Sequence, residues 1–285
     1  MHTAETIIRA LPHQLRSKIT IQNEKNLPDF NDVLVGGMGG SQLSARLLRI
    51  PVCSQYLPPQ PVDPSGSTLY IASSYSGTTE ETLSFARNVL ENNGALAAIT
   101  TGGELLELAV KNHLPHVILP TDAWQPRFST GYGLRALGTL AGMYLSDDFI
   151  TCADKLEQQM EDHARNARRI AEFFENAQPL IYSWGHDESA YVFKIAYNEN
   201  TKIPAFLNVF PELNHNELAG FEWNDKSRHL TEKIRVLVLR TPEPNFEKGL
   251  KRIEATKAVL MDKGIPVMEL TLEGTCLLYT SDAAD

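Results

Sequence analysis

Short apolar runs and longer segments with helical spacing alternate along the first half of the chain. The apolar runs predict buried strands at 32–35, 68–72, 95–100 and 116–119, and the segments between them predict helices at 42–49, 79–92 and 103–112. The dipeptide Asn93-Gly94 is typical of a helix end. Because strands that alternate with helices favour a parallel sheet covered by helices, we expect an α/β fold.

The second half of the chain repeats this order. Its pattern predicts a strand and turn at 180–185, strands at 205–209, 234–239 and 267–272, and helices at 188–200 and 245–263. No residue-level repeat accompanies the repeated order. We therefore infer from pattern alone that the chain forms two doubly wound domains with parallel sheets flanked by helices.

Three further helices are expected outside these two series. They are an N-terminal helix at 3–22, a small and apolar helix at 129–145, and a charged helix at 154–176. The segment 147–153 is expected to be the boundary between the domains. The sequence thus predicts a first domain over residues 1–148 and a second, incomplete domain over residues 149–275.

Residues 276–285 depart from this pattern. They can be back-translated into a sequence that resembles the adapter used in transposase-based sequencing libraries. We therefore expect the natural sequence to stop near Thr275 and the remainder to be a non-native tail.

The composition and charge of the chain limit the classes of protein to which it can belong. A length of 285 residues suits two domains, and 42% hydrophobic with 21% charged residues is typical of globular proteins. A net charge of -9 argues against a general nucleic-acid surface. The absence of an apolar run of about 20 residues, or of a signal-peptide core, predicts a cytoplasmic protein without a membrane partner. The three cysteines form neither a CxxC pair nor an even disulfide framework.

A loop rich in hydroxyl groups follows the expected strand 68–72. Ser74, Ser76 and Thr79 surround Gly77 just before a predicted helix. A phosphate group needs several short donors in a small volume, and Ser, Thr and the first amides of a helix supply them. The alternative is an ordinary helix start in which Thr78 or Thr79 acts as a capping residue.

A second loop of this kind follows the expected strand 32–35. Residues 36–41 are rich in glycine and end in Gly40-Ser41, and a predicted helix follows. Two such loops can converge on one phosphate. The glycine loop lacks the third small residue of a dinucleotide fingerprint, and the chain contains no Gly-Lys-Ser or Gly-Lys-Thr.

Two polar stretches in the second half carry candidate acid–base groups. Glu199 lies at a predicted helix end near Lys202, and His215 lies between Asn214 and Asn216. A carboxylate and an imidazole are suited to moving protons near neutral pH, but each is more often a solvated charge or a hydrogen-bonded loop residue. A metal site is less favoured, since neither HExxH nor a second ligand cluster is present.

These motifs together resemble a known family. The chain resembles the bifunctional phosphoglucose/phosphomannose isomerases, which are two-domain sugar isomerase (SIS) proteins. The resemblance covers nearly all of residues 1–275. The motifs that carry the resemblance stand in the family's order: Gly40-Ser41, residues 74–79, Pro126-Arg127, Asn198-Glu199 and Asn214-His215-Asn216-Glu217.

The resemblance implies a role for each matching residue. The implied sugar-phosphate contacts are Gly40, Ser41, Ser74, Ser76 and Thr79. Arg127 resembles the cation near the reacting carbons, Glu199 the base that moves a proton between C1 and C2, and His215 the residue that assists ring opening. In such homodimers His215 is expected to reach the neighbouring subunit's site.

The implied activity is the interconversion of glucose 6-phosphate or mannose 6-phosphate with fructose 6-phosphate through a cis-enediol, without a metal or organic cofactor. The family's C-terminal catalytic lysine is expected beyond Asp285, and Lys257 and Lys263 are poor substitutes by position. Two alternatives stay open: a non-catalytic SIS protein that binds phosphosugars for regulation, and an amino-sugar isomerase.

Overall fold

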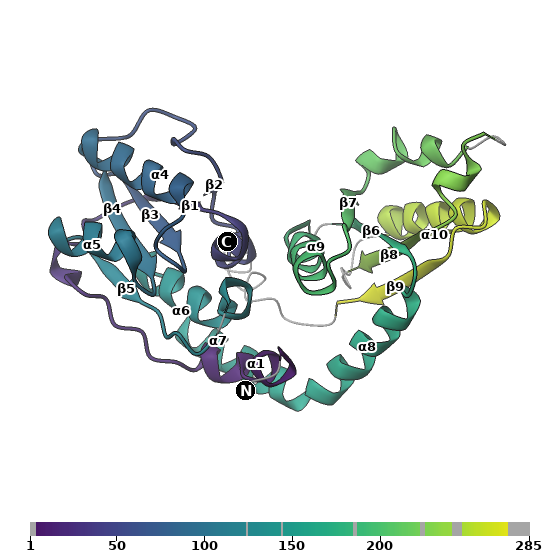
Figure 1. Ribbon diagram of the computed structural model, residues 1–285, viewed down its shortest axis with the longest axis horizontal. Helices are drawn as coiled ribbons and strands as arrows, with labels where there is room; N and C mark the ends of the chain where they lie inside the picture. Colours follow the sequence, from purple (N-terminus) through teal and green to yellow (C-terminus); the bar gives the residue numbers. More distant parts are fainter. Residues whose placement is uncertain are drawn as a thin grey trace. The chain divides into compact units, whose positions relative to one another are not determined.

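The computed structural model describes residues 4–123, 125–143, 145–184, 187–222, 226–240 and 247–272. The chain divides into two compact units, of which the first ends at Met160 and the second begins at Glu161. Each unit contains one parallel β-sheet with helices on both faces (Figure 1). Among the described residues, no helix combines the length and apolar character needed to cross a bilayer.

The sheet of the first unit has five strands in the order β2-β1-β3-β4-β5, and all neighbours are parallel. The strands are β1 (Asp32–Gly37), β2 (Val52–Cys53), β3 (Thr68–Ser74), β4 (Ala95–Thr100) and β5 (His116–Ile118). The chain winds outward in opposite directions from β1 and β3. In such sheets, ligands bind beyond the carboxyl ends of the strands at this switch point.

Helices cover both faces of this sheet because its strands are apolar on both sides. Leu69 and Ile71 face the layer built by α2 (Leu11–Leu15), α3 (Leu43–Leu47), α6 (Thr130–Leu140) and α7 (Ser146–Gln158). Tyr70 and Ala72, which alternate with them along β3, face α4 (Glu80–Glu91) and α5 (Gly103–Lys111).

The sheet of the second unit is also parallel, in the order β7-β6-β8-β9. Its strands are β6 (Gln178–Ser183), β7 (Phe206–Val209), β8 (Ile234–Arg240) and β9 (Val267–Thr271). Ile181 packs on the side of α8 (Met160–Phe173) and α9 (Asp187–Thr201). Tyr182 packs on the other side, with α10 (Glu247–Asp262) and the segment 210–221.

The predicted α/β class, with parallel sheets flanked by helices, is confirmed. The strand β2 was not predicted, because a strand of two residues is too short to leave a pattern in the sequence. The predicted tail at 276–285 lies outside the described residues.

Three predicted helices are wrong in extent, over 3–22, 129–145 and 154–176, and the last of these is divided between α7, which ends at Gln158, and α8, which ends at Phe173. In place of a helix over 3–22, α1 (Ala4–Arg9) is followed by α2, and residues 17–21 have no regular structure and lead to a bridge between Gln22 and His116. Pro12 lies in the first turn of α2, where its missing N–H costs nothing, so a new helix starts there.

The helix predicted over 129–145 ends at Leu140, and α7 crosses the expected boundary segment 147–153. Arg16 of the first unit forms salt bridges to Asp154 and Glu157 of α7, at 2.6 and 2.7 Å. Phe149 and Ala153 of α7 are buried in the core of the first unit, so α7 belongs to this unit and the two compact units divide after Met160. The predicted domain limits themselves stay a prediction.

Candidate active site

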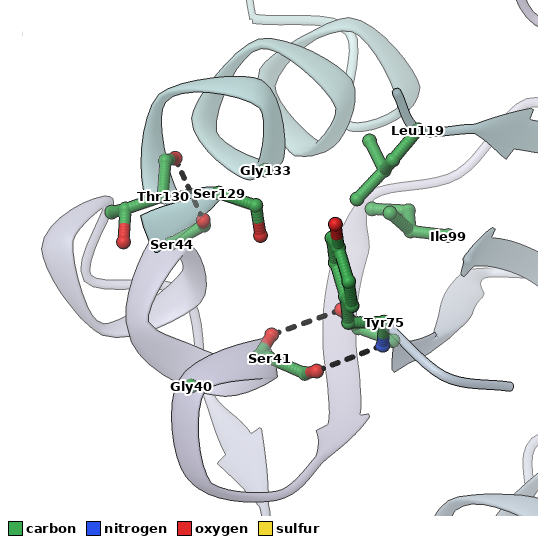
Figure 2. Close-up of a pocket in the computed structure, with 10 residues that line it drawn as sticks. Gly40, Ser41, Ser44, Tyr75, Ile99, Leu119, Ser129, Thr130 and Gly133 are labelled. Atoms are coloured by element: carbon green, nitrogen blue, oxygen red, sulfur yellow. Dashed lines mark hydrogen bonds between the residues drawn. The ribbon is translucent and has the colours of Figure 1, made fainter. Parts of the chain in front are cut away.

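The loop after β1 is joined to the end of β3 by two hydrogen bonds (Figure 2). Ser41 Oγ accepts a bond from the backbone N–H of Tyr75 at 3.0 Å, and Ser73 Oγ donates to the Ser41 carbonyl at 2.9 Å. Gly40 and Ser41 lie in a 3-10 turn, η2 (Gly39–Gln42). The two predicted phosphate loops therefore meet at the switch point of the first sheet.

The hydroxyl loop that follows β3 is organised by its own side chains. Ser74 Oγ accepts from the N–H of Gly77 at 3.1 Å and lies 3.0 Å from Thr79 Oγ1. Ser76 Oγ accepts from Thr78 Oγ1 at 3.0 Å. Ser74 is buried whereas Ser76 is exposed. The loop thus holds its hydroxyl groups close together at the start of α4.

The start of α4 differs from an ordinary capped helix. Thr79 occupies the capping position in an extended conformation, but its side chain makes no capping hydrogen bond. Its hydroxyl pairs with Ser74 instead. Amides in the first turn of a helix that lack a side-chain cap are ready donors to an anion. The Thr79 side chain therefore does not cap α4, and phosphate binding by this loop stays a prediction.

Gly77 fixes this loop against the segment that starts α5. Its φ angle is +69°, and a Cβ atom at this position would lie 1.8 Å from the carbonyl oxygen of Gly102. The Gly77 carbonyl also accepts from the N–H of Leu105 at 2.9 Å. Since only glycine fits this approach, the shape of the hydroxyl loop depends on it.

Arg127 lies beside the glycine loop, in the 3-10 turn η3 (Pro126–Phe128). A Cβ atom added to Gly40 would lie 2.7 Å from the backbone nitrogen of Arg127, so the two backbones are in close contact. The guanidinium carbon of Arg127 lies 4.7 Å from the ring centroid of Phe128. The structure therefore brings Arg127 to the same edge of the sheet as the two phosphate loops.

Gln14 supports this turn and was not predicted from the sequence. Its side chain is 2% exposed, donates through Nε2 to the Phe128 carbonyl at 2.8 Å, and accepts through Oε1 from the N–H of Gly131 at 3.1 Å. A glutamine in an N-terminal helix resembles a surface residue in sequence. Only the tertiary contact between α2 and α6 identifies its role.

A small cavity lies behind the glycine loop (Figure 2). It leaves about 10 Å³ for the centre of a water-sized sphere, which is room for about one water molecule. Among the described residues, the hydroxyl oxygen of Tyr75 has no hydrogen-bond partner, and burial together with Asp122 raises the pKa of this phenol. The cavity is lined by hydroxyl-bearing residues and apolar ones, among them Ser41, Ser44, Tyr75, Ile99, Leu119, Ser129 and Thr130.

Glu199 lies near the carboxyl end of α9 in the second unit, where its side chain is half-buried. Lys202 Nζ donates to the backbone carbonyl of Glu199 at 2.6 Å, and Asn198 Oδ1 accepts from the N–H of Ala205 at 2.5 Å. These bonds tie the end of α9 to the residues that lead into β7. The position of Glu199 is therefore fixed by the helix end.

His215 lies on a different element of the second unit, in the segment after β7. Its side chain is exposed. Its backbone N–H donates to the Glu212 carbonyl at 2.9 Å, at the end of the turn η4 (Glu212–Asn214). The preceding residue, Asn214, donates through Nδ2 to Thr256 Oγ1 of α10 at 2.7 Å. The imidazole thus stands in solvent on a backbone anchored to the unit's core.

Known proteins are similar to this chain over most of its length. Residues 163–280 match a family model described as the bacterial phospho-glucose isomerase C-terminal SIS domain. The bifunctional phosphoglucose/phosphomannose isomerase of Caldicellulosiruptor bescii is 31% identical over 283 residues, which span 90% of this chain and 81% of that protein. The protein of the same name from Thermoplasma acidophilum is 32% identical over 71% of this chain and 66% of its own length.

A solved structure shows the same fold. Tagatose-6-phosphate ketose/aldose isomerase from Escherichia coli aligns with a TM-score of 0.62 at 15% identity, over 95% of this chain and 81% of that one. The identity to the curated relatives over most of the chain identifies its family: the chain belongs to the bifunctional phosphoglucose/phosphomannose isomerases.

Proposed function

We propose that this protein is an aldose–ketose isomerase that interconverts glucose 6-phosphate and mannose 6-phosphate with fructose 6-phosphate. Its membership of a family of isomerases carries the proposal. The convergence of two hydroxyl-bearing loops and Arg127 at one sheet edge supports a phosphosugar as the substrate. The non-catalytic regulator is not favoured, because the relatives that match over most of the chain are named as enzymes.

Each site residue has a defined task in this proposal. Gly40, Ser41, Ser74, Ser76 and Thr79 hold the phosphate, as donor groups at a switch point and a helix start are suited to do. His215 assists opening of the sugar ring. Arg127 stabilises negative charge on the enediolate oxygen.

Glu199 carries the proton between the two carbons. Its carboxylate removes the proton from C2 of the open-chain aldose, and the electron pair moves toward C1 and its carbonyl oxygen, which becomes the enediolate. The O2 hydroxyl proton then passes to O1, which becomes a hydroxyl group, and return of the abstracted proton to C1 leaves a carbonyl at C2 and forms the ketose. Because C2 becomes planar in the cis-enediol, glucose and mannose 6-phosphates lead to the same ketose.

The sugar phosphates are the expected small-molecule partners. The homodimer and the cytoplasmic location stay predictions from the sequence and its resemblance. Sedimentation of the purified protein measures the first of these directly.

A product assay tests the proposed function. Fructose 6-phosphate is supplied to the 285-residue chain and to a version that runs to the stop codon of its gene, and glucose 6-phosphate and mannose 6-phosphate are quantified separately. Formation of both products supports the bifunctional isomerase. Tight binding of fructose 6-phosphate without turnover by either version supports the regulator.

A further inference from the structure

Two residues on neighbouring strands of the second sheet hold one carboxylate. Tyr182 of β6 and Asn208 of β7 are partners in the parallel register, so their side chains leave the sheet on the same face. Tyr182 donates its hydroxyl to Glu217 Oε1 at 2.7 Å, and Asn208 donates through Nδ2 to Glu217 Oε2 at 2.6 Å. Both oxygens of Glu217 are thus engaged by groups fixed in the sheet.

Each donor is itself held in place. Asn208 Oδ1 accepts from the N–H of Val209 at 2.8 Å, which turns the Nδ2 group of the same amide toward Glu217. The side chain of Tyr182 is fully buried and packs edge-on against Phe210. Burial and the contact with Glu217 raise the pKa of the Tyr182 phenol, so this hydroxyl stays protonated and donating at neutral pH.

The carboxylate lies two residues beyond His215. On the other side of His215, Asn214 is bonded to Thr256 of α10 at 2.7 Å. The backbone that carries the imidazole is therefore tied to the unit's core immediately before it and shortly after it. His215 and Asn216, between the two ties, are exposed.

We propose that Glu217 is a positioning residue, which is held by Tyr182 and Asn208 and fixes the segment that presents His215 for ring opening. The inference rests on the proposed role of His215. A group that transfers a proton must be held close to its working geometry, and a misplacement of about 1 Å can cost about 100-fold in rate. Glu217 acts through His215 and has no contact with the substrate in this account.

The hydrogen bonds among Tyr182, Asn208 and Glu217 allow a sharp test. Glutamine in place of Glu217 keeps both contacts, because its Oε1 accepts from Asn208 while its NH₂ group donates to the hydroxyl oxygen of Tyr182. Alanine removes both. Glu217→Gln is expected to keep kcat for fructose 6-phosphate within about threefold of the wild type, and Glu217→Ala to lower it about 10- to 100-fold with little change in KM.

Two further variants complete the set. Tyr182→Phe removes one of the two contacts and is expected to lower kcat less than Glu217→Ala, with no additional loss when the two are combined. Glu212→Ala is the matched control: this exposed carboxylate in the same segment accepts from Asn216 Nδ2 at 2.8 Å, and its loss is expected to leave kcat unchanged. Thermal melts confirm that every variant compared is folded.

An NMR measurement tests the positioning of His215 without turnover. The imidazole resonances of His215, assigned with His215→Gln, are expected to shift in Glu217→Ala and to remain in place in Glu217→Gln and Glu212→Ala. If Glu217→Gln loses as much activity as Glu217→Ala, the carboxylate itself is needed and the positioning role is wrong. Unchanged His215 resonances in Glu217→Ala also overturn it. In the version that runs to the stop codon of its gene, a wild type without turnover but with the expected shifts contradicts the proposed function and leaves the positioning of His215 supported.

Discussion

Ser41 accepts the backbone N–H of Tyr75 through its hydroxyl oxygen at 3.0 Å, and this bond joins the loops after β1 and β3. The bond uses a lone pair of Ser41 Oγ and not its proton. One side chain can therefore join the two loops and still donate to a phosphate.

Replacing Ser41 with alanine is expected to weaken substrate binding. The variant loses a donor to a charged group, worth about 1.5 kcal/mol, so KM for fructose 6-phosphate should rise about tenfold. Thr139→Ala is the control, since this exposed hydroxyl of α6 donates to the Arg135 carbonyl at 2.7 Å. An unchanged KM in Ser41→Ala would show that this hydroxyl does not bind the phosphate.

A comparison of Gly77 with Gly66 distinguishes the effect of a close contact on stability from the effect of a positive φ angle. Both have positive φ angles, of +69° and +80°, but a Cβ atom at Gly66 meets nothing within 4 Å whereas one at Gly77 meets the Gly102 carbonyl at 1.8 Å. We expect Gly66→Ala to lower the free energy of unfolding by about 1 kcal/mol and Gly77→Ala to lower it by more than about 3 kcal/mol. Urea denaturation measures both, and equal losses would contradict the tight approach of the hydroxyl loop to Gly102.

Removing the Tyr75 hydroxyl should cost the protein no stability. Within the described part of the chain, this buried oxygen has no hydrogen-bond partner, and a buried polar group without a partner is unfavourable by about 1–3 kcal/mol. Tyr75→Phe is therefore expected to match or exceed the wild type in the free energy of unfolding. A loss of more than about 1 kcal/mol would indicate that the hydroxyl is bound, for example by a water molecule in the adjacent cavity.

Tyr132 should make stability fall at alkaline pH. Burial, and then the 2.9 Å hydrogen bond to Asp122, raise the pKa of Tyr132 to about 12, against about 10 for an unfolded tyrosine. Between these values the unfolded chain has lost the proton that the folded chain keeps, so the free energy of unfolding falls as pH rises from about 10 to about 12.

The variant Tyr132→Phe isolates this contribution. It should be less stable than the wild type by about 1 kcal/mol below pH 10, and its stability should decline less steeply between about pH 10 and 12. Denaturation curves at a series of pH values give both quantities. Parallel declines in the two proteins would assign the alkaline loss to other groups.

Local patterns predicted much of the fold, and the reason is physical. Strands covered on both faces are apolar throughout, so β3 and β4 were visible as runs at 68–72 and 95–100. Glycine and hydroxyl residues that follow such runs predicted where the two loops lie, because their chemistry is local, and phosphate binding by these loops stays a prediction. The long N-terminal helix was wrong because Pro12 and the bridge between Gln22 and His116 override local helical spacing.

The remaining site features depend on contacts between distant segments. Gln14 reaches Phe128 only when α2 packs beside α6. No local sequence pattern indicates a contact between two residues so far apart along the chain. The two hydrogen bonds to the Glu217 carboxylate require the strand register that pairs Tyr182 with Asn208. The sequence places Glu217 in a motif with His215, but only the paired strands show what the carboxylate contacts.

Replacing Glu199 with glutamine tests the proposed base. The amide has nearly the same size and shape but no basic oxygen, so proton transfer between C1 and C2 should stop while the phosphate loops of the first unit still bind the sugar phosphate. Glu188→Gln, at the opposite end of α9, is the matched control for removing one carboxylate from this helix.

The most direct measurement follows fructose 6-phosphate by ³¹P NMR in the presence of wild type or Glu199→Gln, because one spectrum reports both binding and product. We expect the wild-type protein to form glucose 6-phosphate and mannose 6-phosphate, and Glu199→Gln to bind fructose 6-phosphate without forming either. Turnover retained in Glu199→Gln would rule out this base. Absence of both products from the wild type, in a version that runs to the stop codon of its gene, would contradict the proposed isomerase.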